Sequence, residues 1–355
     1  MTTAPPAPPR PLRVTALAGG VGGARFLRGL LTALDETGTG RPAAELTVIS
    51  NTADDITLHG LRVCPDLDSV MYTLGGGIDE QRGWGRSEET SGVADELAAY
   101  GQRPTWFTLG DKDIATHLVR TRLLREGLPL SEVTARLLQR WRPPFRTPVR
   151  LLPMTDDVVE THVDLARVDP AAHHGEAGGR RVHFQEWWVR LHAKVPAERI
   201  EPVGADAARP GPGVLEAVAG ADVVLLPPSN PVVSIGTILR VPGVREALRA
   251  TAAPVVGVSP VIGGAPVRGM ADACLAAIGV PTTARAVAAL YADLLDGWLV
   301  ADQDAFDGGP ALRVLPRPLL MSDTAATAAL AAAAIDLLLE LRAAGARRDG
   351  DRASA

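Results

Sequence analysis

A strand, a glycine turn, a helix and a second strand follow one another at the start of the chain, and this order constrains the fold more than any other feature. Residues 12–18 form a short apolar run rich in strand formers, and the cluster Gly19-Gly20-Val21-Gly22-Gly23 follows at once. Apolar residues then recur at helical spacing over residues 24–34. A second apolar run, residues 46–50, ends in the polar turn Asn51-Thr52-Ala53-Asp54-Asp55. This order is typical of the opening of a doubly wound parallel sheet.

The same pattern of a buried strand followed by a polar turn recurs in the second half of the chain. Residues 223–226 precede Pro227-Pro228-Ser229-Asn230-Pro231, and residues 255–258 precede Ser259-Pro260. In open α/β sheets, ligands bind beyond the carboxyl ends of the strands. We therefore predict an α/β fold with a doubly wound, mostly parallel Rossmann-like sheet and a ligand site at that edge.

Two helices are predicted within residues 113–141, and they form a small helical insertion. The Rossmann-like nucleotide-binding domain is then expected to comprise residues 12–112 and 142–340. The proline-rich start, residues 1–11, and the polar end, residues 345–355, are expected to be disordered tails.

Composition and charge exclude several classes of function. The net charge is −5, so no overall basic field attracts nucleic acid or an anionic membrane. Two cysteines are too few for a disulfide framework or a thiolate zinc site. The first apolar stretch contains Arg25 and Arg28, which argues against a membrane span. Without a recognisable signal peptide, we expect a cytoplasmic protein that binds neither nucleic acid nor membrane.

The glycine turn predicts a phosphate site, because backbone N–H groups at a helix N-terminus attract anions and glycines permit close approach. Gly20, Gly22 and Gly23 are the expected contacts. No Lys-Ser/Thr follows, so the turn is not a Walker loop. Arg25 stands where a dinucleotide fingerprint requires Gly or Ala, and no ribose-binding acid ends the second strand, which counts against a nicotinamide-dependent oxidoreductase. The alternative is that the glycines only allow tight packing.

Four aspartates, Asp54, Asp55, Asp66 and Asp68, follow the second predicted strand. Carboxylates from neighbouring strand-end loops are the ligands by which Mg²⁺ is held beside substrate phosphates. Asp66 or Asp68 is alternatively the N-cap of a following helix. Capping does not account for all four, so the sequence predicts a Mg²⁺-assisted enzyme acting on a phosphorylated, nucleotide-type substrate.

Further polar turns supply candidate substrate contacts. Trp84 lies in a glycine-rich segment suited to a mobile aromatic lid. A turn with a capped helix is the alternative for the residues near Gly110. The full set of predicted substrate-binding residues is Gly20, Gly22, Gly23, Asn51, Asp66, Asp68, Trp84, Thr108, Gly110, Asp111, Ser229, Asn230, Ser234 and Ser259.

Taken together, these segments resemble the 2-phospho-L-lactate transferase family of coenzyme F-420 biosynthesis, and the form is closest to its actinobacterial, phosphoenolpyruvate-transferring branch. The resemblance extends from Leu17 to Asp272, most of the chain. The segments that carry it are LAGGVGGARFL, NTADD, HGLRVCPDLDSVMYTLGGGIDEQRGWG, TLGDKDIATHLVRT, LLPMTDD, HFQEWWV, PPSNPVVSIGTIL and GVSPVIGGAPVRGMAD.

The resemblance implies a Mg²⁺-dependent transferase and a homodimer. A phosphoenolpyruvyl or 2-phospholactyl group would move from a guanosine-diphosphate-linked donor to the deazaflavin 7,8-didemethyl-8-hydroxy-5-deazariboflavin, with release of GMP. It implies Asp54 and Asp68 as metal ligands and catalytic residues, with Asp68 also holding the acceptor hydroxyl. An acceptor contact is implied near residues 108–111, where Thr108 replaces the basic residue of some family members.

A family of UDP-sugar-binding regulators of the same fold is the main alternative. It resembles this chain at the glycine turn and at NTADD, where its acidic pair precedes a glycine-serine run. Here Ile56-Thr57-Leu58-His59 follows instead, and residues 65–84 also favour the transferase.

Overall fold

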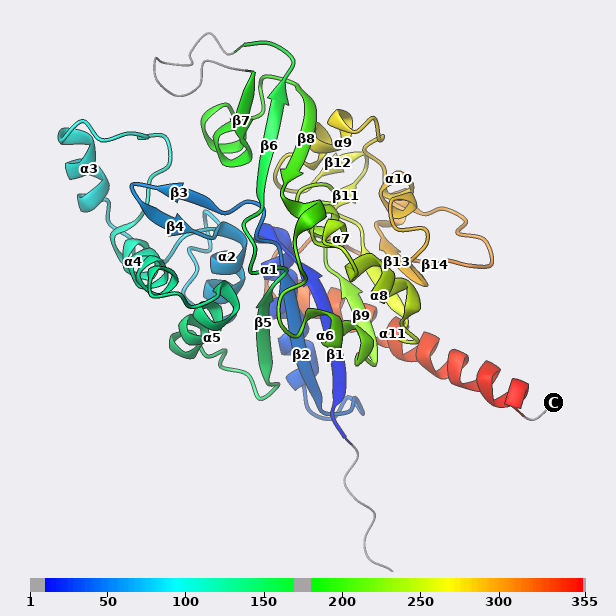
Figure 1. The fold of residues 1–355 in the computed structure, drawn as a ribbon. Coiled ribbons are helices and arrows are strands. Elements are labelled where there is room, and N and C mark those ends of the chain that lie inside the picture. Colours follow the sequence, from blue (N-terminus) through cyan, green and yellow to red (C-terminus); the bar gives the residue numbers. More distant parts are fainter. Residues whose placement is uncertain (1–9, 169–179, 354–355) are drawn as a thin grey trace, which may run out of the picture.

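The centre of the protein is a seven-stranded sheet in which every neighbouring pair is parallel, as seen in a computed structural model that describes residues 10–168 and 180–353. Its strand order is β14-β13-β10-β9-β1-β2-β5 (Figure 1). The predicted parallel, doubly wound sheet is confirmed. The strands are β1 (Leu12–Ala18), β2 (Ala44–Ser50), β5 (Val149–Pro153), β9 (Val223–Leu226), β10 (Val255–Val258), β13 (Gly297–Val300) and β14 (Arg313–Pro316).

The direction of winding reverses beside β1. From β1 the chain adds β2 and β5 on one side, whereas β9, β10, β13 and β14 follow on the other. Ala18 pairs with Ser50 and Ala16 with Leu225, so β1, β2 and β9 end at the same edge of the sheet. This reversal is the topological switch point at which open α/β sheets bind ligands.

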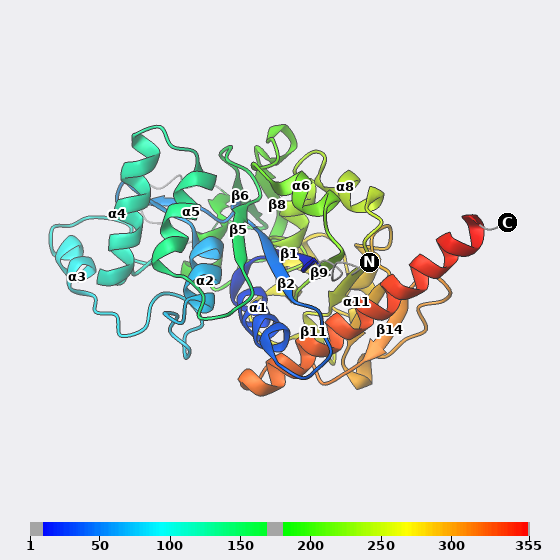
Figure 2. The same cartoon turned by 90° about the horizontal axis from the view of Figure 1, so that it is seen from below.

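Helices cover both faces of the sheet because side chains of the buried strands point alternately to each. In β1, Val14 and Ala16 belong to one apolar core and Leu17 to the other. Helices α1 and α11 lie on one face and α6 and α8 on the opposite one (Figure 2). The covering helices are α1 (Gly20–Asp35), α6 (Val214–Ala219), α7 (Ile235–Arg240), α8 (Val244–Ala250), α9 (Ala271–Ala277), α10 (Ala284–Ala289) and α11 (Thr324–Ala353).

The chain between β2 and β5 extends to one side of the sheet, where it forms a hairpin and four helices (Figure 1). Two of these are the helices predicted within residues 113–141, although the first begins two residues earlier. The division into a Rossmann-like domain and an insertion stays a prediction. The elements are β3 (Ile56–Leu58), β4 (Leu61–Val63), α2 (Pro65–Leu74), α3 (Gly92–Ala99), α4 (Asp111–Arg125) and α5 (Leu130–Arg140).

A small antiparallel sheet lies beyond the carboxyl ends of the central strands, and the sequence did not predict it. It comprises β6 (Glu160–Leu165), β7 (Arg181–His183) and β8 (Ala197–Val203), in the order β7-β6-β8. The backbone N–H of Thr161 donates to the carbonyl of Ala53 at 2.6 Å, which joins this sheet to the acidic turn after β2. A short hairpin, β11 (Val261–Ile262) with β12 (Ala265–Pro266), follows β10.

The C-terminal end differs from the expectation of a disordered tail at residues 345–355. Helix α11 continues through Gly345 and Gly350 to Ala353, because its alanines, leucines and arginines favour helix strongly and each glycine costs only about 1 kcal/mol. Residues 354–355, and residues 1–9 of the other predicted tail, lie outside the described part of the chain.

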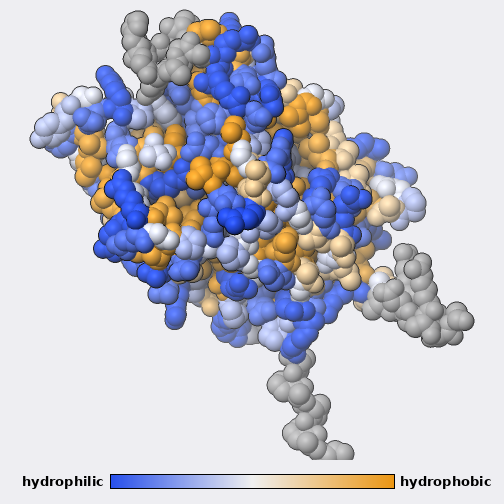
Figure 3. Space-filling view, in the orientation of Figure 1, coloured by the Kyte–Doolittle hydropathy of each residue, from blue (hydrophilic) through white to orange (hydrophobic). Residues whose placement is uncertain are grey.

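Residues 324–345 of α11 are long and apolar enough to cross a membrane by length and composition alone, a test that core helices also pass. Here Leu330, Ile335 and Leu338 are buried in the core that includes α1 and the sheet, so α11 is a core helix of this structure. On the face drawn in Figure 3, hydrophilic and hydrophobic residues are interspersed and form no single apolar surface.

Candidate active site

Two turns meet at the switch point, one after β1 and one after β9. The backbone N–H of Gly19 donates to Ser229 Oγ at 3.1 Å. A Cβ atom at Gly19 would lie 2.3 Å from Asp66 Oδ2, so only glycine allows this approach. Helix α1 begins at the next residue, Gly20, whose φ is +66°. The glycine turn and the Ser229 turn, both predicted as substrate contacts, are therefore brought together.

Gly22 and Gly23 are required by the packing of these turns. A Cβ atom at Gly22 would lie 2.6 Å from the carbonyl oxygen of Pro228, and one at Gly23 would lie 2.3 Å from Ser229 Oγ. Tight packing, the alternative weighed for the turn, accounts for both residues. Phosphate binding stays a prediction that rests on the backbone at the start of α1.

Asn51 connects the turn after β2 with helices α2 and α7 at this edge. Its Nδ2 donates to Asp66 Oδ2 at 2.9 Å, and its Oδ1 accepts from the backbone N–H of Ala53 at 3.0 Å and from Thr237 Oγ1 at 2.7 Å. All of these residues are buried, so the amide fixes the relative positions of the turn and the two helices. Thr237 was missed by the sequence analysis, although it lies three residues after Ser234 in α7 and shares its helix face.

Asp66 faces the N-terminus of α1. The backbone N–H of Gly20 and the Ser234 hydroxyl donate to it, yet burial raises the pKa of its carboxyl to about 6. Helix α2 begins at Pro65 with Cys64 as its N-cap and no side-chain cap, so neither Asp66 nor Asp68 is the N-cap. The capping alternative is wrong because both carboxylates, in the first turn of α2, are used in contacts to other elements.

Asp54 is a buried carboxyl with no cation paired to it in the described part of the chain. It is 4% exposed, and its Oδ1 has no hydrogen-bond partner among the described residues. Burial raises its pKa well above the usual value, and the negative charges of Asp66 and Asp55 raise it further. An unpartnered oxygen in a group of like charges is the local chemistry that a bound cation satisfies. Asp54 and Asp66 therefore fit a divalent metal that takes oxygen ligands.

Asp55 and Asp68 each have an arginine instead. Arg62 Nη2 lies 3.6 Å from Asp55 Oδ2, although burial still raises the pKa of Asp55 to about 7. Arg120, 1% exposed, donates to Asp68 Oδ2 at 3.0 Å and binds Oδ1 through its other terminal nitrogen. Within the described part of the chain, Asp68 is therefore neutralised by a bidentate arginine, and Asp54 and Asp66 have no paired cation. Asp55 is intermediate, because its arginine lies 3.6 Å away and neither of its oxygens has a hydrogen bond to a described residue.

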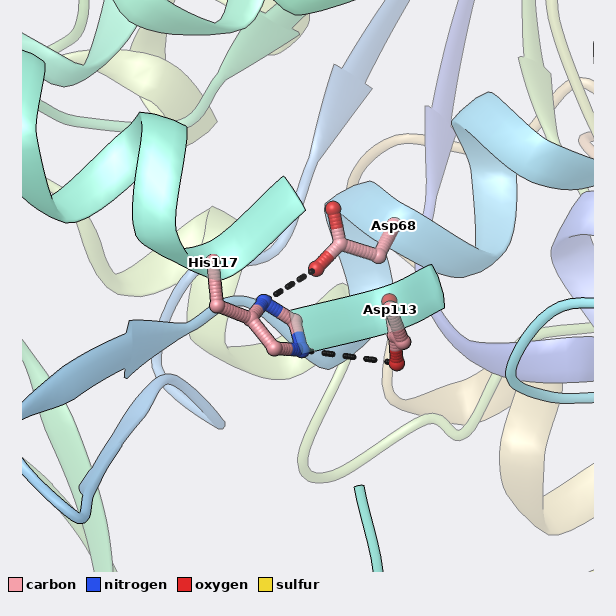
Figure 4. A group of neighbouring side chains, drawn as sticks. All are labelled: Asp68, Asp113 and His117. Atoms are coloured by element: carbon pink, nitrogen blue, oxygen red, sulfur yellow. Dashed lines mark ion pairs between the residues drawn. The ribbon is translucent and has the colours of Figure 1, made fainter. Parts of the chain in front are cut away.

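Helix α4 adds two further side chains to Asp68. The Nδ1 of His117 lies 3.7 Å from Asp68 Oδ2 and its Nε2 lies 3.4 Å from Asp113 Oδ2 (Figure 4). Asp68, Asp113 and His117 are close enough to hold a metal ion, but Arg120 already supplies positive charge there. The sequence analysis missed Arg120, although residues 113, 117 and 120 share one face of a predicted helix.

The residues near Gly110 serve local packing. The Asp111 carboxylate accepts from the backbone N–H groups of Gly92 and Val93, at 3.1 and 2.9 Å, at the start of α3. A Cβ atom at Gly110 would lie 2.2 Å from the carboxyl carbon of Glu89. These contacts agree with the alternative of a turn with a capped helix. Thr108 lines a cavity of about 110 Å³ below α3.

The remaining predicted contacts differ in their surroundings. Trp84 is 44% exposed, and the adjacent Gly83 packs against Val21 of the glycine turn. Asn230 Oδ1 accepts two backbone N–H groups within its own turn. Ser259 Oγ bonds to the backbone of Val261, so it too closes a local turn. Trp84 therefore lies near the start of α1, whereas the polar atoms of Ser259 are used locally.

Comparison with known proteins identifies the family of the chain. Residues 14–308 match the family described as 2-phospho-L-lactate transferase CofD. The chain is 60% identical over 333 residues to the phosphoenolpyruvate transferase of Thermobifida fusca, and the matched region covers 93% of this chain and 99% of that protein. It is 60% identical over 336 residues to the phosphoenolpyruvate transferase of Kitasatospora aureofaciens, covering 93% and 99% of the two chains.

Among solved structures, a UPF0052 family protein from Bacillus halodurans has a TM-score of 0.51 and 18% sequence identity, over 84% of this chain and 83% of that one. At this identity the likeness shows the fold alone. The family match and the close relatives lead further: the chain belongs to the 2-phospho-L-lactate transferase family and is a transferase of coenzyme F-420 biosynthesis.

Proposed function

We propose that the enzyme transfers a phosphoenolpyruvyl group, or the related 2-phospholactyl group, from a guanosine-diphosphate-linked donor to the deazaflavin 7,8-didemethyl-8-hydroxy-5-deazariboflavin. The terminal ribityl hydroxyl oxygen attacks the phosphorus that carries the enolpyruvyl group. The bond from that phosphorus to the bridging oxygen breaks, GMP leaves, and the hydroxyl proton passes to a base. The names of the relatives support the choice of the enolpyruvyl donor.

The observation that carries the proposal is the uncompensated Asp54–Asp66 pair beside the glycine turn. The Asp66 carboxylate lies against Gly19 and Gly20, at the position where a phosphate is predicted. Two anions do not share that helix N-terminus without a cation between them. A bound divalent metal ion would therefore allow a donor phosphate to lie beside Asp54 and Asp66, because it would offset the repulsion between their negative charges.

Mg²⁺ is the metal we propose, and Asp54 and Asp66 are the residues that would hold it. Its ligands are oxygens, and when bound it neutralises negative charge on the transferring phosphate. Asp68, the other ligand implied by the family resemblance, has both oxygens bound to Arg120. We therefore propose that Asp68 binds the acceptor hydroxyl, orients its oxygen and receives its proton.

The rest of the site then positions the two substrates. Backbone N–H groups at the start of α1 would bind donor phosphate, which is favoured by the positive end of the helix dipole. Ser229 and Ser234 present hydroxyls at the same turn. Phosphoryl-type transfer needs positioning and charge neutralisation more than covalent chemistry, so this arrangement suits it.

A competition experiment tests the proposal. Enzyme, Mg²⁺ and deazaflavin are mixed with equal amounts of the enolpyruvyl and lactyl donors, and the products are followed by mass spectrometry. We expect the enolpyruvyl product together with an equal amount of GMP. A preferred lactyl product would correct the donor. No product from either donor, combined with binding of a UDP-sugar, would favour the regulatory alternative.

We also propose that the enzyme acts in the cytoplasm as a homodimer. The support is the family resemblance, together with the burial of α11 in the core. Light scattering coupled to size-exclusion chromatography measures the mass in solution, and a monomer at micromolar concentration would contradict the dimer.

A further inference from the structure

Arg120 is an arginine in an unusual place. Its side chain, on α4, is 1% exposed, and its Nε has no hydrogen-bond partner within residues 10–168 and 180–353. Arginine is rarely fully buried, because removing a guanidinium from water costs several kcal/mol unless it is paired and hydrogen-bonded. The contacts of its two terminal nitrogens should therefore explain why it is there.

Those contacts converge on Asp68. One terminal nitrogen donates to Asp68 Oδ2 at 3.0 Å and the other binds Oδ1. The first also lies 3.1 Å from His117 Nδ1 and 3.4 Å from the carbonyl oxygen of Arg62. Because the guanidinium is planar and binds both carboxylate oxygens, it fixes the orientation of Asp68 as well as its charge.

A second polar contact joins the same two helices without touching Asp68. The Tyr72 hydroxyl of α2 donates to Asp113 Oδ1 of α4 at 2.6 Å. Packing between α2 and α4 therefore has a polar link of its own. Arg120 is the contact that acts on the orientation of Asp68.

We propose that Arg120 is a positioning residue for the acceptor alcohol: it holds the Asp68 carboxylate in the orientation that binds and deprotonates the ribityl hydroxyl. This inference rests on the proposed role of Asp68. Arg120 thereby supplies the positive charge that a metal ion would otherwise supply to Asp68, Asp113 and His117. The proposed metal is instead held by Asp54 and Asp66.

The central test compares Arg120→Met and Arg120→Lys with the wild-type enzyme in steady-state kinetics for each substrate. A misplaced catalytic group costs on the order of 10²-fold. For Arg120→Met we expect kcat/KM for the deazaflavin to fall by roughly that factor, with KM for the donor unchanged. Arg120→Lys keeps the charge but not the planar fork, so it should recover part of the loss.

Tyr72→Phe is the matched control, because it removes a polar link between α2 and α4 and leaves the contacts of Asp68 with Arg120 and His117 in place. Thermal melting of each variant measures the structural effect. Arg120 has only a packing role if Arg120→Met lowers kcat/KM for the deazaflavin and for the donor by the same factor, and if Tyr72→Phe does the same at an equal loss of thermal stability. If Arg120→Met does not fold, Arg120→Lys decides, and wild-type acceptor kinetics in that variant would overturn the proposal.

Asp68→Asn separates this inference from the proposed function. Normal turnover in folded Asp68→Asn would remove the proposed role of Asp68, and the inference with it. Impaired turnover in Asp68→Asn beside normal acceptor kinetics in folded Arg120→Met would leave the role of Asp68 intact and reject the positioning role of Arg120 alone.

Discussion

Replacing Asp54 by Asn should have opposite effects on the metal-free and the metal-bound enzyme. In the metal-free protein, Asp54 is buried among Asp66 and Asp55 with an unpartnered oxygen. Keeping a carboxylate ionised beside like charges in a buried site costs about 1–3 kcal/mol, and the neutral amide of asparagine removes that cost at a pH where Asp54 is ionised, so the substitution should stabilise the fold by about that amount. With roughly 2.1 cal/mol/K of unfolding entropy per residue, a chain of 355 residues gains about 1–4 °C in melting temperature.

Mg²⁺ should make the wild-type enzyme more stable than Asp54→Asn. A ligand at about 100 times its dissociation constant stabilises the folded state by about 2.7 kcal/mol, which is about 4 °C for this chain. The wild-type enzyme should show that shift, and Asp54→Asn should show little of it until Mg²⁺ is raised well above the wild-type requirement. Turnover of the variant should recover in part over the same Mg²⁺ range.

Differential scanning fluorimetry with and without Mg²⁺ measures both effects, and Asp55→Asn is the control. Asp55 lies in the same turn, but Arg62 lies 3.6 Å from it, so its loss should leave the Mg²⁺ shift unchanged. Equal Mg²⁺ shifts in wild type and Asp54→Asn would refute the assignment of Asp54 as a metal ligand. A metal-free Asp54→Asn protein less stable than wild type would refute the argument from uncompensated charge.

Three further predictions concern the same edge of the sheet. Activity should disappear with EDTA and return with added Mg²⁺, and full turnover in metal-free buffer would remove the metal from the proposal. Gly19→Ala should lower the free energy of unfolding by about 1–3 kcal/mol in urea titrations, since its Cβ would lie 2.3 Å from Asp66 Oδ2; unchanged stability would mean that the turns separate freely. The metal-free protein should lose stability as pH rises from about 4 to about 7, because folded Asp66 and Asp55, with pKa values of about 6 and about 7, retain protons that the unfolded chain releases. Urea titrations at several pH values measure this, and a rise in stability over that interval would contradict it.

Four of the seven central strands, β1, β2, β9 and β10, could be predicted because each is a short apolar run followed by a polar turn. Side-chain alternation and the switch point follow from that order. The antiparallel sheet was not predicted, although the residues of β6, Glu-Thr-His-Val-Asp-Leu, alternate between half-buried and buried with the period typical of a strand. Its partners have weaker signals, because β7 is only three residues long and none of the residues of β8 is fully buried.

The separate surroundings of the aspartates could not be predicted for a related reason. Asp66 and Asp68 are two residues apart, yet Asp66 contacts Asn51 and Asp68 contacts Arg120, which is 52 residues further along the chain. Residue type and spacing show that carboxylates gather after β2. Which of them receives a cation depends on long-range packing, and no local pattern contains that information.

The junction between β1 and β9 has a consequence for how the enzyme loses activity. Gly19 contacts Ser229, and Asn51 contacts Thr237, 186 residues later in the sequence. Each half of the sheet therefore supplies only part of the binding surface. Both apolar cores also extend across this junction, so a ligand that bridges β1 and β9 would stabilise the folded state as a whole. Bound donor should accordingly slow proteolysis in the turns that follow β1 and β9 more than elsewhere in either half of the sheet.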